Sequence, residues 1–93
     1  MFAGIQNYYE RLVFEEIKRV LFKDQSEYDA DYMEDIACVA LNHLPPRYVR
    51  HAVDLTSHLT DMEIQDINKE VSSAVDYAIT LTGSWRTKRD DEH

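Results

Sequence analysis

The chain has only two prolines, and they are adjacent, at Pro45 and Pro46, near the middle of its 93 residues. Its two glycines, Gly4 and Gly83, lie near the two ends. Because proline and glycine are the residues that most often interrupt a helix, the long stretches between these positions are free to be helical. Apolar residues recur there at spacings of three and four, and no alternating segment is long enough to predict a strand. The sequence therefore predicts an all-α domain.

The first predicted helix begins at Gln6 or Asn7 and ends at Phe22. Asn7 is expected to cap it, with Glu10 three residues later, as in a capping box. One stripe of this helix is expected to be buried. It consists of Tyr9, Leu12, Val13, Ile17, Val20 and Leu21. Residues 23–30 are polar and acidic, which predicts a loop.

The second predicted helix begins near Asp31, where Glu34 completes a capping-box pattern. It ends at Pro45, which disfavours the helical conformation in the residue before it. Its apolar face is expected to consist of Met33, Ile36, Ala37, Ala40, Leu41 and Leu44. Cys38 has apolar neighbours, so its thiol is expected to be buried in this face and unreactive.

The last predicted helix begins after Thr60, which can cap it together with Glu63, and ends at Gly83. Its buried stripe is expected to be Ile64, Ile67, Val71, Ala74, Val75, Ala78 and Leu81. Residues 1–84 thus form a small single domain of three main helices. An irregular Pro-Pro-Arg-Tyr connection joins the second helix to the last. Residues 85–93 are expected to form a flexible charged tail.

The charge balance excludes several functions. The chain has 18 acidic and 10 basic residues and a formal net charge of −8, which argues against direct binding of DNA or RNA and of an anionic membrane surface. We see no signal peptide and no apolar run long enough to span a bilayer, so a cytoplasmic protein is expected. A core this small gains buried area by association, which favours a homodimer.

The connection after the prolines has an unusual charge. Arg47 and Arg50 are the only basic residues between Asp24 and Asn68, and Tyr48 lies between them. One interpretation is an anion site, because the planar guanidinium group matches phosphate groups and purine edges. The alternative is structural: Arg47 caps the end of the preceding helix and Arg50 pairs with a nearby acid. An extended segment would place the two arginines on opposite faces, whereas a turn would bring them together.

Other chemistry has little support in the sequence. The candidate metal ligands Cys38, His43, His51 and His58 lack any recognised zinc spacing, and His43 is most simply a solvated surface residue. There is also no glycine-rich phosphate loop. We therefore expect neither an enzyme nor a metal site nor a resident cofactor. The aromatic and basic cluster at residues 85–89 could fold over a bound anion, or it could be an ordinary soluble terminus.

Two segments resemble the late competence development family ComFB. The first is Asn-Tyr-Tyr-Glu-Arg-Leu-Val-Phe-Glu-Glu at residues 7–16, and the second is residues 35–49, which contain Leu-Asn-His-Leu-Pro-Pro-Arg-Tyr. The likeness covers about residues 5–80. It implies a mainly helical, dimeric fold and a regulator that binds a cyclic dinucleotide, chiefly cyclic di-GMP and in some members cyclic di-AMP. Some members hold zinc through cysteines between the first two helices. This chain has acids at residues 24–29 instead, so the zinc is not expected here.

The resemblance and the charge pattern together give a functional hypothesis. Arg47 and Arg50 would contact phosphate or the O6/N7 edge of guanine, Tyr48 or His51 would stack on a base, and Asp54 would accept from guanine N–H groups. The expected ligand residues are Asn42, Arg47, Tyr48, Arg50, His51 and Asp54, of which the first supports the turn or the ligand. The ligand state would be relayed to an unidentified partner. The alternative is a protein-interaction adaptor without a small-molecule ligand.

Overall fold

A computed structural model describes residues 4–22, 30–50 and 57–91, with side chains up to residue 83. Three main helices make up most of the described part, which confirms the predicted all-α single domain. Two strands of two residues each accompany them. The elements in chain order are β1 (Gln6–Asn7), α1 (Tyr9–Leu21), α2 (Ala30–His43), β2 (Tyr48–Val49) and α4 (Asp61–Asp91).

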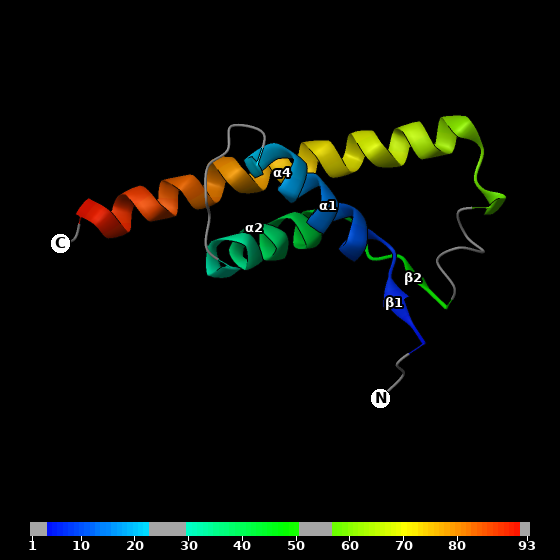
Figure 1. Cartoon of the computed structure of the whole chain (residues 1–93), viewed down its shortest axis with the longest axis horizontal. Helices are drawn as coiled ribbons and strands as arrows, with labels where there is room; N and C mark the ends of the chain where they lie inside the picture. Colours follow the sequence, from blue (N-terminus) through cyan, green and yellow to red (C-terminus); the bar gives the residue numbers. More distant parts are fainter. Residues whose placement is uncertain (1–3, 23–29, 51–56, 92–93) are drawn as a thin grey trace.

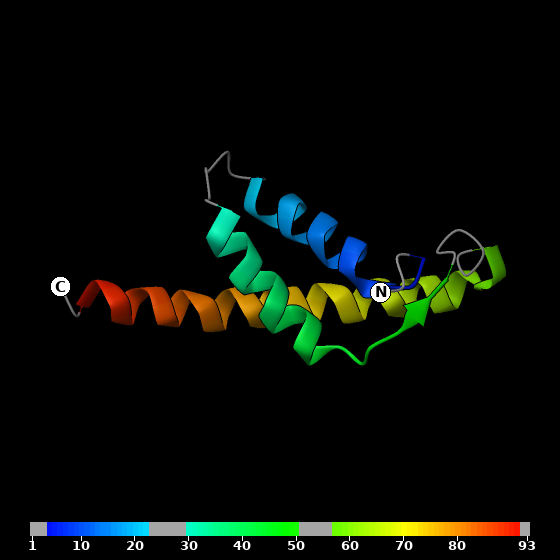
Figure 2. The same ribbon diagram turned by 90° about the horizontal axis from the view of Figure 1, so that it is seen from below.

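The longest helix, α4, contacts both α1 and α2. In both ribbon views α1 and α2 lie against its middle part, and each pair of these three helices is in contact (Figures 1 and 2). The two strands form a ribbon that projects from the helices near the first half of α4 (Figure 1). The C-terminal part of α4 extends past α1 and α2 on the other side. The ribbon and the end of α4 are therefore at opposite ends of the fold.

The core lies where the three helices meet. In α1 the buried residues recur every fourth position, at Tyr9, Val13, Ile17 and Leu21. The other two helices contribute Tyr32, Ile36, Ala40, Leu44, Ile67, Val71, Ala74, Val75 and Ala78. The alanines in this set leave room for α2 and α4 to approach closely. Several residues of the predicted stripes are only partly buried, at the rim of the core. They are Leu12, Val20, Met33, Ala37, Leu41, Ile64 and Leu81.

The start of α1 differs from the prediction. Gln6 and Asn7 belong to β1, and the helix begins at Tyr9 with Tyr8 at the N-cap position. The reason is that β1 pairs with β2, a partner more than 40 residues away that no local pattern reveals. The Asn7 side chain still accepts a hydrogen bond from the Tyr9 amide at 3.2 Å. The residue expected to be the cap thus performs part of that role from within a strand.

The predicted start of the last helix is confirmed. The Glu63 amide donates to Thr60 Oγ1 at 3.1 Å, and the Thr60 amide donates to Glu63 Oε1 at 3.3 Å, which is a reciprocal capping box. The second helix begins at Ala30, within one residue of the prediction. The predicted loop before it, apart from Ala30, lies outside the described residues.

The predicted end of the last helix is wrong. Glycine ends a helix when it adopts the left-handed conformation, and Gly83 does not have a positive φ. The helix therefore continues through it to Asp91. Just before the glycine, the Thr82 hydroxyl donates to the Ala78 carbonyl at 2.8 Å, so this buried polar group is satisfied within the helix. That residues 85–93 behave as a flexible tail stays a prediction.

The predicted burial of Cys38 is also wrong, because its thiol is exposed. The buried line of α2 passes through Ile36 and Ala40. Cys38 lies two residues from each, which corresponds to about 200° around a helix and places it on the opposite side. Its apolar neighbours in the sequence are therefore not its neighbours in space. None of the described helices is both long enough and apolar enough to cross a membrane.

Candidate functional site

The segment after the prolines is extended. β2 pairs antiparallel with β1, so that Gln6 lies opposite Val49 and Asn7 lies opposite Tyr48. Of the two conformations left open by the sequence, the structure has the one in which side chains alternate between two faces. Burial follows this alternation, because Arg47 and Val49 are partly buried whereas Tyr48 and Arg50 are exposed. The two arginines consequently lie on opposite faces of the ribbon.

Hydrogen bonds to Asn7 and Tyr8 fix the position of this segment. Pro45 and Pro46 have no N–H group, so after Leu44 the first backbone donor is the Arg47 amide. This amide donates to Asn7 Oδ1 at 3.2 Å, and the Arg47 carbonyl accepts from the Tyr8 amide at 2.6 Å. The strand that follows the prolines is thus held against the start of α1.

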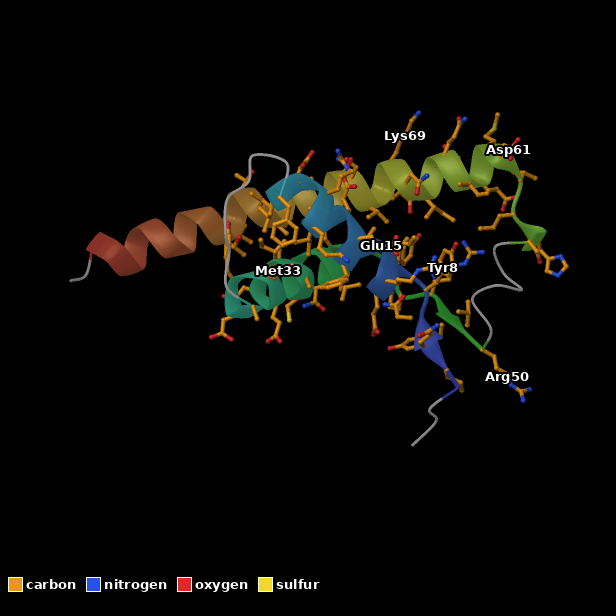
Figure 3. The ribbon with its side chains drawn as sticks, viewed as in Figure 1. Tyr8, Glu15, Met33, Arg50, Asp61 and Lys69 are labelled. Carbon is orange, nitrogen blue, oxygen red and sulfur yellow. The ribbon has the colours of Figure 1, made fainter. Side chains whose placement is uncertain are left out.

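The exposed face of the ribbon combines an aromatic ring with a positive charge. Tyr48 is 69% exposed. Figure 3 shows Arg50 at the far end of β2, with its side chain directed away from the helices. Arg50 forms no hydrogen bond or ion pair with any residue that the structure describes, so the expected pairing with a nearby acid is not seen there. A flat ring and a guanidinium group on one face can together stack on a planar base and bind a phosphate.

Ile5 is a further residue of this face that the sequence did not reveal. The observed register, continued by one residue, places it across the ribbon from Arg50, and its side chain is 47% exposed. Residues directly opposite each other in a strand pair point to the same side. The exposed face therefore has an apolar, an aromatic and a cationic side chain. It could not be predicted because two-residue strands have no periodicity.

Arg47 lies on the other face, near Tyr9 and α4. The Tyr9 hydroxyl donates to Glu70 Oε2 at 3.0 Å. Burial raises the pKa of Tyr9, as do the hydrogen bond to Glu70 and the negative charge of Glu70, whereas the positive charge of Arg47 lowers it. No hydrogen bond from the Arg47 side chain to the end of α2 occurs among the described residues, so the expected helix cap is not seen.

The remaining predicted site residues do not join this face in the described part. Asn42 is exposed on the last turn of α2, an element separate from the ribbon. His51 and Asp54 lie outside the described residues. The structure thus brings together Tyr48 and Arg50, places Arg47 on the opposite face, and separates Asn42 from them.

A second feature lies where α2 ends against α4. His43 is exposed, as the sequence predicted, and it also stacks on Tyr77, with ring centroids 4.4 Å apart and an interplanar angle of 19°. A hollow of about 360 Å³ adjoins it. The hollow is lined by His43, Leu44, Pro45, Lys69, Glu70 and Ser73. Its charges have both signs, which favours no single class of ion.

The described residues contain no group of three or more His, Cys, Asp or Glu side chains placed to hold a metal ion. The chain matches the model of a family described as late competence development protein ComFB over residues 6–84. The match includes the ribbon, the di-proline connection, α1 and α2, and most of α4. No curated protein and no solved structure matches the chain.

Proposed function

Because this chain belongs to the late competence development protein ComFB family, we propose that it is a signalling protein that binds a cyclic dinucleotide, with cyclic di-GMP as the preferred ligand. The exposed face of the β1–β2 ribbon is the observation that supports the proposal. There the side chains of Tyr48 and Arg50 lie on one face, and neither forms a hydrogen bond or an ion pair with a described residue. The ligand state is passed on to a protein partner.

The chemistry of the ligand fits this face. Cyclic di-GMP has two phosphates and two guanines. Arg50 can donate two parallel hydrogen bonds to a phosphate or to the O6 and N7 atoms of guanine, while the Tyr48 ring stacks on the base. Arg47 supplies a second positive charge on the other face of the same strand. In the proposal His51 offers a second stacking surface and Asp54 accepts from guanine N1–H and N2–H, with Asn42 supporting the turn.

We further propose that the protein is a homodimer in the cytoplasm. A ligand with two-fold symmetry suits a two-fold homodimer, because each half of the ligand then meets an equivalent surface. We place this dimer in the cytoplasm and assign it no catalytic role. Light scattering after size exclusion, with and without nucleotide, measures whether the dimer exists and whether the ligand alters it.

Calorimetric titration tests the ligand and its site together. Cyclic di-GMP and cyclic di-AMP are titrated side by side into the parent protein, Arg50→Ala, and the double variant Arg47→Ala/Arg50→Ala. A lost hydrogen bond between charged groups costs about 1.5–3 kcal/mol, so Arg50→Ala should weaken binding roughly ten- to a hundred-fold. Lys18→Ala, which removes an exposed charge from α1, is the matched control and should bind like the parent. A double variant that binds as well as the parent would refute the site.

A second function has a specific observation in its favour. Large apolar side chains are exposed at several places on the helices as well as on the ribbon, namely Ile5, Phe14, Phe22, Tyr48, Met62 and Tyr77. Such side chains are common anchors in protein interfaces. They fit an interaction adaptor without a small ligand. A ligand at a hundred times its Kd adds about 2.7 kcal/mol of stability and raises Tm by several degrees, so an unchanged Tm across a nucleotide panel would favour the adaptor.

A further inference from the structure

The side-chain oxygen of Asn7 links the segment after the prolines to the first residue of α1. Asn7 Oδ1 accepts from the Arg47 amide and from the Tyr9 amide, each at 3.2 Å. The Tyr8 amide adds a bond to the Arg47 carbonyl at 2.6 Å. The amide and the carbonyl of Arg47 are therefore held by Asn7 and Tyr8, although Asn7 and Arg47 are 40 positions apart in the chain.

The ribbon depends on these bonds more than most strand pairs would. Each strand has two residues, and a hairpin-sized pair is at best marginally stable without further support. The two prolines contribute no N–H groups, so the Arg47 amide is the first donor that can anchor the chain after α2. Without Asn7 this partly buried amide would have no acceptor among the residues that the structure describes. Leaving it unsatisfied would favour detachment of the segment.

The same side chain connects the ribbon to the helices. The Tyr9 amide that Asn7 accepts from belongs to the first residue of α1. The Tyr9 ring is buried in the core, and its hydroxyl donates to Glu70 of α4. Asn7 thus links the segment that carries Tyr48 and Arg50 to Tyr9. Tyr9 belongs to α1 and is hydrogen-bonded to α4. Figure 3 shows the neighbouring Tyr8 where the ribbon joins α1.

We infer that Asn7 is the positioning residue of the ligand site: it holds the backbone of Arg47 so that Tyr48 and Arg50 are presented on one rigid face. The inference rests on the proposed function for its ligand, while the positioning itself is a property of the free protein. Asn7 lies opposite Tyr48 in the register, and in this inference it acts by holding the Arg47 amide. When the hydrogen bond between the Arg47 amide and Asn7 is lost, only a fraction of the molecules is competent to bind. The apparent Kd then rises by the inverse of that fraction.

A pair of variants separates the acceptor from the rest of the side chain. Asn7→Leu keeps the approximate volume and removes the acceptor, whereas Asn7→Asp keeps an oxygen that can accept both amides. We expect Asn7→Leu to weaken cyclic di-GMP binding about ten-fold or more. Asn7→Asp should stay within about three-fold of the parent at a salt concentration that screens its added charge. Asn68→Leu, an exposed asparagine on α4, is the matched control and should bind like the parent.

Hydrogen exchange supplies a readout that needs no ligand. The amides of Arg47 and Val49 should exchange faster in Asn7→Leu than in the parent and return to parental rates in Asn7→Asp. If Asn7→Leu does not fold, Asn7→Ala, which also lacks the acceptor, takes its place. Unchanged exchange in the variant without the acceptor would overturn the inference, and so would equal weakening by Leu and Asp. A parent protein that binds no cyclic dinucleotide would refute the proposed function, while the exchange rates would still decide the role of Asn7.

Discussion

The helical core and the β1–β2 ribbon are held together by different means. Ile17, Ile36, Ala40 and Val75 have no exposed surface, and all three main helices supply residues to one apolar cluster. The ribbon has two short strands and two backbone hydrogen bonds at Arg47, and one of its candidate ligand residues, Tyr48, is largely exposed. Many small contacts make the core insensitive to any one polar bond. The ribbon can be loosened by the loss of a single acceptor, which suits a surface that must respond to a ligand.

The largest expected effect is in the core. Ile17→Ala removes a fully buried side chain from the centre of α1 and should reduce the free energy of unfolding by about 2–5 kcal/mol, because a cavity remains. Urea unfolding followed by circular dichroism measures this. Met62→Ala, at an exposed position, is the control and should change stability by less than about 0.5 kcal/mol. A similar loss in both variants would contradict the division between core and surface.

The ribbon should show the opposite behaviour. Tyr48→Ala removes the stacking surface, which should cost about 1–3 kcal/mol of cyclic di-GMP binding. The free energy of unfolding should barely change, because the ring makes little buried contact. Tyr48→Phe keeps the ring and should bind almost as the parent does. If Tyr48→Ala destabilised the protein as much as Ile17→Ala, the ribbon would be part of the core.

A smaller effect is expected at the start of α4. Thr60→Ala removes the capping hydroxyl that accepts from the Glu63 amide, and caps of this kind contribute about 1 kcal/mol. Thr80→Ala is the control, since its hydroxyl donates only to the carbonyl of Asp76 within the helix. Thermal unfolding should separate the two variants by a few degrees. Equal melting temperatures would show that the capping box contributes nothing measurable.

The smallest effect concerns pH. The hydrogen bonds from Arg19 hold the pKa of Glu16 below its usual value of 4.5, against the opposing effect of partial burial. A carboxyl group with a lowered pKa in the folded state stabilises the protein above pH 4.5, and that contribution is lost as pH falls through the folded pKa. Denaturant unfolding between pH 7 and pH 3 should therefore depend on pH less steeply in Glu16→Gln than in the parent. Identical slopes would mean that the pair with Arg19 adds nothing to stability.

The core could be predicted because it follows one rule. Residues such as Val13 and Ile17, or Val71 and Val75, lie one helical turn apart, so the sequence alone reveals the buried face. Cys38 shows where that reasoning fails. Its neighbours in the sequence are apolar, but a displacement of two residues from the buried line leads to the far side of the helix.

The site could be predicted only in part, because its geometry depends on a partner distant in sequence. Arg47, Tyr48 and Arg50 were identifiable from charge placement, but their division between two faces follows from pairing with Gln6 and Asn7. Asn7 was interpreted as a helix cap because its carboxamide oxygen suits a free amide. The structure uses the same property for two amides, one of them 40 residues away.

The most direct test of the account is an NMR titration of labelled protein with cyclic di-GMP, followed through backbone amides. The account predicts shift changes for Ile5 and for residues 47–50, saturating with the affinity found by calorimetry, while amides of the core such as Val75 stay unchanged. Changes gathered around His43 and Lys69 instead would move the site to the hollow between α2 and α4. A spectrum without change at saturating nucleotide would contradict ligand binding by this ribbon.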